Sequence, residues 1–235
     1  MRNKGIDVSN HQGDINWSEV KVDYAIIKAG YGREISQKDE RFEANYRGAK
    51  AANIPVGAYW YSYATTPAEA ITEANVCIEV LKGKTFEYPI YFDIEENRQF
   101  ATGTANCSEM VMAFCKTLEA AGYFAGIYSS KSQLDSYLTK DVRKRYTVWV
   151  AQYNRECTYS LPYGMWQYAV VGSKWDTYGE GHISGINGNC DVDYCFIDFP
   201  DIIRKSGLNG FPKVTAASKA ETEHAPAAQP DVNQP

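Results

Sequence analysis

The order of strand-like and helix-like segments constrains this sequence most strongly. Helical spacing covers residues 41–53, 66–82, 104–121 and 130–138. Short segments rich in apolar and aromatic residues predict eight strands, at residues 5–9, 24–30, 54–63, 88–95, 124–129, 146–153, 165–171 and 190–198. Alternating strands and helices form parallel sheets, because a parallel connection needs a long crossover. Eight such strands predict an α/β fold, a closed TIM-like (β/α) barrel.

The last third of the chain departs from an ideal barrel. Two earlier helix starts carry capping patterns, Thr66 with Glu69 and Ser130 with Gln133. After residue 138 no helical pattern separates the remaining strands, and Gly-rich loops join them instead. We therefore predict an irregular barrel with about five helices and none in the last third.

The domain boundaries follow from length and composition. Residues 1–212 fit one barrel domain. Residues 213–235 contain three Pro, many Ala and no aromatic residue, which predicts a linker or a disordered tail. Such a tail either leads to an absent C-terminal module or is a floppy terminus. The first residues include no apolar signal segment, so we expect a protein made without one or a secreted protein whose signal was trimmed.

Charge, hydropathy and metal-ligand content exclude several classes of protein. The net charge of -5 and a pI near 5.3 argue against nucleic-acid binding. No apolar run is long enough to span a membrane. With three histidines and no CxxC pattern, we expect no metal site and no cofactor. We also expect the protein to be a monomer. The six cysteines are expected to be mostly reduced, with a disulfide from Cys157 to Cys190 or Cys195 left open.

Two acidic side chains at one strand end carry the candidate chemistry. Side chains alternate along a strand, so Phe92 faces the helices while Tyr91, Asp93 and Glu95 face the barrel interior. Burial and mutual repulsion raise the pKa of at least one of the two carboxyls. A protonated carboxyl can protonate a leaving oxygen while an ionised neighbour stabilises positive charge, as glycoside hydrolysis requires. The alternative is an ordinary acidic strand end facing solvent.

Other polar residues are predicted to converge on the same interior. Asp7 alternates with apolar residues in the first strand, and Asp191 enters the last strand. The first and last strands of a closed barrel are neighbours, so the two acids are expected to meet. Lys28 is expected to be a buried cation that balances them. The alternatives are a capping role for Asp7, loop hydrogen bonding for Asp191 and a surface position for Lys28.

The chain contains 18 Tyr, 5 Trp and 9 Phe. These rings either fill the core or line a groove for sugars, since Tyr and Trp offer an apolar face and a polar tip. We predict that Tyr59, Tyr61, Tyr153 and Trp166, at inward or strand-end positions, flank a groove and stack on sugar rings.

Six short motifs occur in an order that resembles one enzyme family. They are DVSNHQG at 7–13, GAYWYS at 57–62, YFDIE at 91–95, WVAQY at 149–153, WQY at 166–168 and GNCDVD at 188–193. Together they resemble the family 25 glycoside hydrolases, the N-acetylmuramidases often called Chalaropsis-type lysozymes. The resemblance spans about residues 5 to 200.

The resemblance implies a reaction on peptidoglycan. The family hydrolyses the β-1,4 bond from N-acetylmuramic acid to N-acetylglucosamine, with retention, in a groove at the C-terminal strand ends. By resemblance Glu95 is the general acid and then the base. Asp93 is either a nucleophile or, as we favour, the partner of the substrate's own N-acetyl group.

The resemblance also assigns the substrate-binding positions. Asp7 and Asp191 match the family's other site acids, Tyr61 matches an aromatic position beside the sugar, and Gln167 lies in a matching motif. Two positions depart from the family: they are Trp60, where His is often found, and Asp193, where Asn is frequent.

The partner implied is the peptidoglycan glycan strand at the bacterial cell wall. The protein reaches it by secretion or as an endolysin released by a phage. The rival interpretations are a wall-binding module without activity, a chitinase-like enzyme and a metal-dependent deacetylase.

Overall fold

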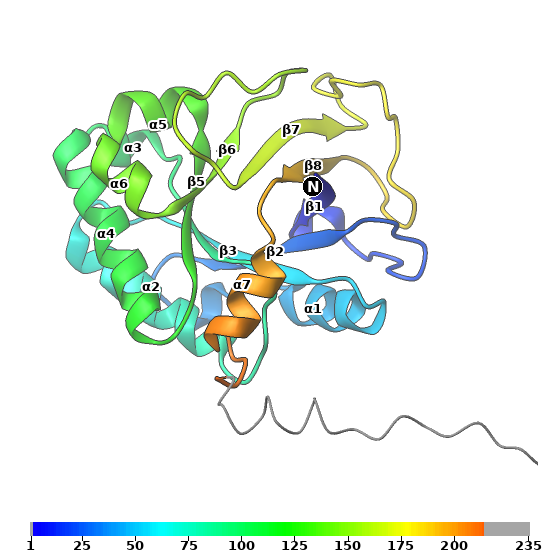
Figure 1. Ribbon diagram of the computed structural model, residues 1–235, viewed down its shortest axis with the longest axis horizontal. Coiled ribbons are helices and arrows are strands. Elements are labelled where there is room, and N and C mark those ends of the chain that lie inside the picture. The colour runs from blue at the N-terminus through cyan, green and yellow to red at the C-terminus, as the bar shows by residue number, and fades with distance from the viewer. Residues whose placement is uncertain (1, 214–235) are drawn as a thin grey trace, which may run out of the picture.

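The computed structural model describes residues 2–213 and confirms the predicted α/β barrel (Figure 1). Eight strands close into a barrel in chain order: β1 (Asn3–Val8), β2 (Tyr24–Tyr31), β3 (Val56–Tyr61), β4 (Ile90–Asp93), β5 (Ala125–Ser130), β6 (Thr147–Ala151), β7 (Met165–Val171) and β8 (Cys190–Cys195). The helices are α1 (Phe42–Ala51), α2 (Pro67–Leu81), α3 (Asn97–Phe100), α4 (Thr104–Ala120), α5 (Lys131–Tyr137), α6 (Lys140–Arg145) and α7 (Phe199–Ser206).

The direction of the last strand differs from the prediction. Strands β1 to β7 pair in parallel, whereas β8 runs antiparallel to both β7 and β1. The expectation of parallel pairing throughout is therefore wrong for β8. Within the described residues no helix lies between β6, β7 and β8, as predicted. Without a crossover helix after β7, the chain can turn back and pair in the opposite direction.

Three helices were not predicted from the sequence. Helices α3 and α6 have only four and six residues, which is too short for a helical period to be recognised. Helix α7 follows the last strand. Asp198 accepts a hydrogen bond from the first turn, and Gly207 ends the helix in the left-handed conformation at φ 63°. Both capping residues were available in the sequence as evidence for this helix.

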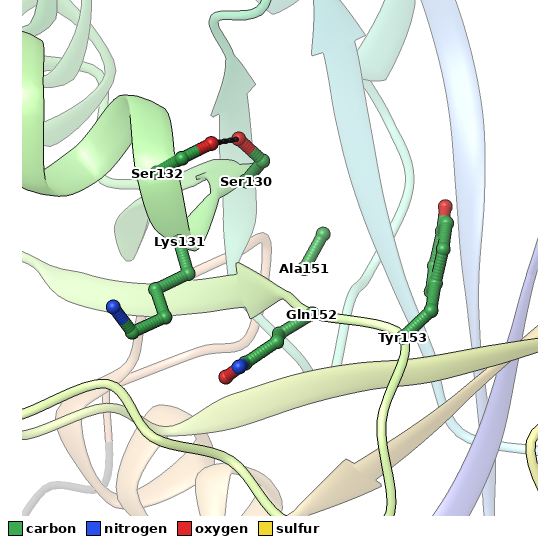
Figure 2. A pocket seen from close by; sticks show the side chains of 6 residues that line it. All are labelled: Ser130, Lys131, Ser132, Ala151, Gln152 and Tyr153. Carbon is green, nitrogen blue, oxygen red and sulfur yellow. Dashed lines mark hydrogen bonds between the residues drawn. The ribbon is translucent and has the colours of Figure 1, made fainter.

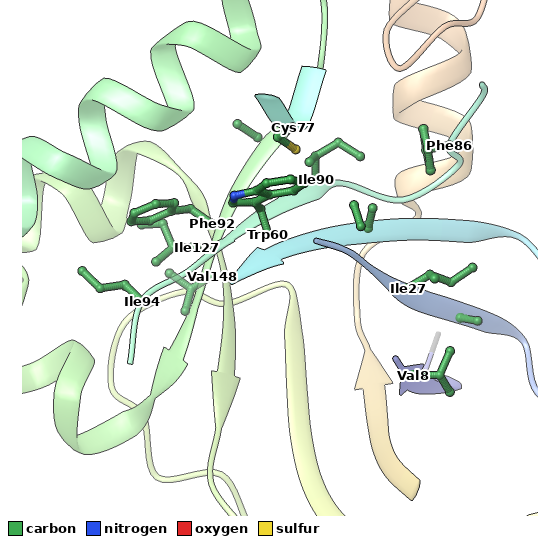
Figure 3. Close-up of a cluster of buried hydrophobic side chains, with 14 of the residues drawn as sticks. Val8, Ile27, Trp60, Cys77, Phe86, Ile90, Phe92, Ile94, Ile127 and Val148 are labelled. Carbon is green, nitrogen blue, oxygen red and sulfur yellow. The ribbon is translucent and has the colours of Figure 1, made fainter. Parts of the chain in front are cut away.

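An apolar core lies between the strands and the surrounding helices. Trp60, Ile90, Phe92, Ile127 and Val148 are fully buried there (Figure 3). The helices α2 to α6 gather on this side of the barrel (Figure 1). The expected outward orientation of Phe92 is thus confirmed.

A second core fills the barrel interior with aromatic rings. Tyr24 and Tyr91 are fully buried in it, together with Trp149. A Cβ atom at Gly5 would lie 2.3 Å from the Tyr24 ring, and one at Gly126 would lie 2.5 Å from the Tyr91 ring. Glycine in the adjoining strand therefore makes room for each ring. These tyrosines fill the barrel, which accounts for part of the aromatic surplus.

No helix covers the outer face of β7 and β8 within the described residues. Tyr168 and Tyr194 stack there with ring centroids 4.2 Å apart. The Tyr168 hydroxyl donates to Glu180, in the loop between the two strands, at 2.7 Å. The Arg2 guanidinium lies 4.0 Å from the centre of the Tyr194 ring. Aromatic stacking and this loop therefore cover the outer face of β7 and β8, whereas helices cover the strands elsewhere in the barrel.

Other expectations concern the cysteines, the membrane and the tail. All six cysteines lie within residues 2–213 and are free thiols, so the disulfide that was left open does not form. No helix in this range is long and apolar enough to span a membrane. The predicted linker begins at residue 213, and residues 214–235 lie outside the described range.

Asn209 ties the segment after α7 to the barrel floor. Its Nδ2 donates to the carbonyl oxygens of Phe86 and Tyr88 at 3.1 and 2.8 Å, and its Oδ1 accepts from the Phe124 amide at 2.7 Å. Asn209 is fully buried. We expect Asn209→Ala to lower the free energy of unfolding by about 3 kcal/mol or more, because three buried backbone groups lose their partners. Urea denaturation measures the loss.

Asn53 provides the matched control for this variant. It shares the positive backbone angle, with φ 57° against 54° for Asn209, but its side chain is exposed. Asn53→Ala therefore carries only the strain of Ala in the left-handed region, about 1 kcal/mol. Equal losses for the two variants would show that the Asn209 side-chain contacts contribute nothing.

Candidate active site

The two acidic residues of the D-x-E motif sit at the rim of the barrel, where β4 ends. The carbonyl oxygen of Asp93 accepts from the Ser62 amide at 3.0 Å. The amide of Ile94 donates to the Tyr128 carbonyl at 3.1 Å, and its carbonyl accepts from the Ser129 hydroxyl at 2.5 Å. The backbone that carries the acids is therefore held by both neighbouring strands, which fixes the two side chains at the strand end.

The Asp93 carboxyl is buried with one oxygen unpaired. Asp93 is 3% exposed, and its Oδ1 accepts no hydrogen bond from any residue in the range 2–213. Burial raises its pKa well above the usual range, the charge of Glu95 adds to the rise, and Lys28 opposes it. Glu95 is half-buried, and burial raises its pKa too, again against the effect of Lys28. Both carboxyls of the pair therefore have a raised pKa, in the direction expected from the sequence.

The structure brings Asp7 and Asp191 together as predicted. They are register partners in the antiparallel pair of β1 and β8. Burial raises the pKa of Asp191 to about 6, and the charge of Glu95 contributes. Burial also raises the pKa of Asp7 well above its usual range. These two acids therefore share the interior with the D-x-E pair.

Gln167 connects the acid cluster to two tyrosines. Its Nε2 donates to Asp7 Oδ2 at 2.8 Å. Its Oε1 accepts from the hydroxyls of Tyr128 and Tyr153 at 2.9 and 3.2 Å. The side-chain amide thus makes three hydrogen bonds, and the one to Oδ2 fixes the orientation of Asp7.

Lys28 lies beside the carboxyl pair. Its Nζ is 5.0 Å from the centre of the Tyr61 ring and 5.7 Å from that of Tyr31. Its charge lowers the pKa of both Asp93 and Glu95. Lys28 was expected to be a buried cation that balances Asp7 and Asp191; it is instead half-buried and acts on Asp93 and Glu95.

The four aromatic residues predicted to flank a groove take different positions. Tyr61 lies at the end of β3, and its hydroxyl donates to Glu96 at 2.6 Å. Tyr59 is more deeply placed and packs edge-on against Trp149, with centroids 6.1 Å apart. Tyr153 is 38% exposed at the rim, and its ring centre is 5.8 Å from that of Trp175.

Trp166 does not join the other aromatic residues. It is 5% exposed in the outer core, and its Nε1 donates to the Gln152 carbonyl at 2.8 Å. Gln167 points inward from β7, so its chain neighbour points outward. The expected position of Trp166 beside the groove is therefore wrong.

The site residues expected from the sequence omit several inward residues, although Asp193 was noted as a departure from the family. Asp193 lies two positions after Asp191, on the same inward face of β8, and is fully buried. Tyr128 faces inward from β5 and donates to Gln167. Strand alternation alone could have identified both positions. Trp175 was unpredictable, because it lies in the irregular loop between β7 and β8.

A cavity of about 380 Å³ opens between the start of α5 and the end of β6 (Figure 2). Its lining comes from the start of α5 and the end of β6, and consists of Ser130, Lys131, Ser132, Ala151, Gln152 and Tyr153. The Tyr153 ring borders this cavity while its hydroxyl contacts Gln167. The cavity is therefore linked to Asp7 through Tyr153 and Gln167, and it has hydroxyl, amide and ammonium groups on its walls.

Comparison with known proteins identifies the family. The sequence matches the family model described as "Glycosyl hydrolases family 25" over residues 6–176, which is more than half of the chain. The chain belongs to glycosyl hydrolase family 25. This confirms the resemblance that the sequence motifs indicated. Within residues 2–213 of this family 25 chain, no group of three His, Cys, Asp or Glu side chains is arranged to hold a metal ion.

Similar proteins support the family 25 assignment. The autolytic lysozyme of Clostridium acetobutylicum is 26% identical over 194 residues, which cover 81% of this chain and 55% of that protein. The autolysin LytC from Streptococcus pneumoniae, solved with a synthetic peptidoglycan ligand, has a TM-score of 0.71 at 28% identity, over 83% of this chain and 47% of its own. This chain thus spans about half the length of these two relatives.

A third comparison supports the family 25 fold alone. The lysozyme from Streptomyces coelicolor has a TM-score of 0.70 at 24% identity, over 88% of this chain and 97% of its own.

Proposed function

We propose that this family 25 protein is a lysozyme. It hydrolyses the β-1,4 bond from N-acetylmuramic acid to N-acetylglucosamine in peptidoglycan, with retention of configuration. The observation that carries this function is the pair of buried, perturbed carboxyls, Asp93 and Glu95, at the barrel rim. The names of its relatives, an autolytic lysozyme and an autolysin, support the same substrate. The protein acts at the bacterial cell wall, as a secreted enzyme or as an endolysin.

Glu95 serves as the general acid and then as the base. Its half-buried carboxyl meets solvent at the rim, and burial raises its pKa. The protonated form gives its proton to the leaving oxygen, and the resulting carboxylate then activates water. This exchange needs a group that can both hold and release a proton near working pH.

Asp93 assists the N-acetyl group of the substrate. Its carboxyl, at the rim end of β4, accepts from the acetamido N–H as the acetyl oxygen attacks the anomeric carbon. The neighbouring Lys28 favours an ionised carboxyl in the pair, and a carboxylate stabilises the positive charge that develops. Attack by the substrate's own group, followed by attack of water from the other side, retains the configuration.

The other site residues bind the glycan. Asp7, oriented by Gln167, and Asp191 offer carboxyl oxygens to sugar hydroxyls. Tyr59, Tyr61 and Tyr153 supply ring faces and hydroxyls along the rim, as sugars require. Trp166 takes no part, since it lies in the outer core.

Digestion of purified cell walls tests the function directly. We expect the suspension to clear and the released fragments to carry reducing muramic acid ends, read by mass spectrometry after reduction. Reducing glucosamine ends would refute the bond assigned. Walls that bind the protein without clearing would instead indicate a binding module.

Lys28→Met is expected to move the pH optimum upward by about one unit. Lys28 stabilises the ionised forms of Asp93 and Glu95, so its removal raises both pKa values. The acid and alkaline limbs, which report the ionisation of this coupled carboxyl pair, then both shift to higher pH. The pH profile of wall clearing measures the change.

Lys116→Met supplies the control for Lys28→Met. Lys116 is exposed on α4, so the substitution makes the same change in net charge away from the site. Its pH profile should match that of the parent. An identical shift in both variants would attribute the effect to net charge alone.

A further inference from the structure

Asp193 is a buried carboxyl that the mechanism above does not use. It lies in β8 below the rim and is fully buried. Its Oδ1 accepts from Trp149 Nε1 at 2.7 Å. Its Oδ2 meets no hydrogen-bond donor among residues 2–213. A buried acceptor without a donor is costly, so something must satisfy this oxygen.

The groups that face Asp193 offer no cation. Its charged neighbours are Asp7, which points inward from the paired strand β1, and Asp191, two residues earlier in β8. The remaining titratable neighbours are Tyr24 from β2, Tyr91 from β4, Tyr153 after β6, and Cys190 and Cys195 at the ends of β8. Two carboxylates in contact at such a site repel strongly, because little water screens them.

We propose that Asp7 and Asp193 share a single proton, held between the Asp7 carboxyl and Oδ2 of Asp193. The proton supplies the donor that Oδ2 lacks, and it converts a repulsive contact into a charge-assisted hydrogen bond. Asp7 is then fixed from two sides, by this proton and by the Gln167 amide at 2.8 Å. Asp193 is therefore a positioning residue for Asp7.

The electrostatics of the cluster agree with one shared proton. Burial raises the pKa of both Asp7 and Asp193 well above the usual range. The charge of Asp193 raises the pKa of Asp7 further, whereas the Asp7 carboxyl lowers the pKa of Asp193 by hydrogen bonding to it. The pair then carries one negative charge instead of two. The charge of Lys28 remains available to Asp93 and Glu95, whose pKa values it lowers.

The pH dependence of unfolding tests the proton without reference to catalysis. Above about pH 4, an ordinary carboxyl is ionised in the unfolded chain, while the native pair keeps its proton. The native state then binds more protons, so the free energy of unfolding falls as pH rises. In Asp193→Asn the amide donates to Asp7 and carries no titrating proton. The slope of the free energy of unfolding against pH should therefore become flatter, by the amount that corresponds to about one bound proton. An unchanged slope overturns the proposal.

Two matched variants test the positioning role, which rests on the proposed function. Asp193→Asn leaves the charge on Asp7, and wall hydrolysis should stay within about threefold of the parent. Asp7→Asn donates to Asp193 in the same way, but moves the charge to the buried floor, and hydrolysis should fall about tenfold or more. Equal activity losses in the two variants overturn the positioning role.

Asp193→Leu keeps the branched shape of the side chain but removes any donor to Asp7, together with the acceptor of Trp149 Nε1. The Leu variant should lose more activity than Asp193→Asn. Equal activities of these two variants overturn the proposal. If the parent protein fails to digest walls, the proposed function fails. The slope of unfolding against pH still decides whether the proton is shared.

Discussion

We expect Glu95→Gln to lower kcat on purified cell walls by about a thousandfold or more. General acid–base catalysis contributes roughly 10² to 10⁴ in rate, and Gln keeps the shape of the side chain without a transferable proton. The half-buried site has room for the amide, so the circular dichroism spectrum and the unfolding midpoint should change little. The rate of turbidity loss and the count of new reducing ends measure the effect.

The adjacent Glu96 makes a sharp control for this variant. Glu96 accepts from the Tyr61 hydroxyl at 2.6 Å and begins α3 with a reciprocal capping contact to Gln99. Glu96→Gln keeps an acceptor oxygen for Tyr61, so we expect a loss of less than tenfold. If Glu96→Gln is as damaging as Glu95→Gln, the acid has been assigned to the wrong residue.

Asp93→Asn is expected to reduce kcat by about a hundredfold or more while raising stability. Asp93 is buried with an unpaired oxygen, and its pKa is raised mainly by desolvation. Its ionised form therefore destabilises the fold, increasingly as pH rises above the usual carboxyl range. A neutral amide removes that effect, and we expect a gain of about 1 kcal/mol or more at pH 7.

The two outcomes of Asp93→Asn must occur together. Activity loss accompanied by lower stability would mean that the variant disturbs the packing of the barrel rim. Unchanged activity would exclude Asp93 from the reaction. Thermal unfolding and wall hydrolysis on the same preparation measure both quantities.

A modified substrate separates the two roles considered for Asp93. Glycan strands whose muramic acid lacks the N-acetyl group cannot assist their own cleavage. The parent enzyme should cut them far more slowly than acetylated strands if Asp93 acts through the acetamido group. Comparable cutting, with a covalent sugar on Asp93 trapped by mass spectrometry, would identify it as a nucleophile.

The sequence predicted the barrel because its apolar pattern repeats in a recognisable period. Strand alternation also placed Asp7, Asp93 and Asp191 on inward faces, and the closed barrel brought them together. Helix α7 was missed although Asp198 and Gly207 mark its ends. The direction of β8 was missed because an apolar segment has the same pattern in either direction.

Packing decided the features that no local pattern contains. Trp166 was predicted from the sequence to stack on sugar rings. Because Gln167 points into the barrel, the neighbouring Trp166 points outward and packs in the outer core. The orphaned oxygens of Asp93 and Asp193 depend on which side chains approach from other strands. Such contacts join residues far apart in the chain, so only the folded arrangement reveals them.

The reversed course of β8 ties catalysis to the closure of the barrel. Because this strand runs opposite to its neighbours, its first residues, and not its last, reach the rim, and they bring Asp191 beside Asp7. The loop at residues 172–189 therefore determines both where β8 pairs with β1 to close the barrel and where Asp191 lies at the rim. Insertions or deletions in that loop alter substrate fit and fold integrity at once, so selection on the one constrains the other.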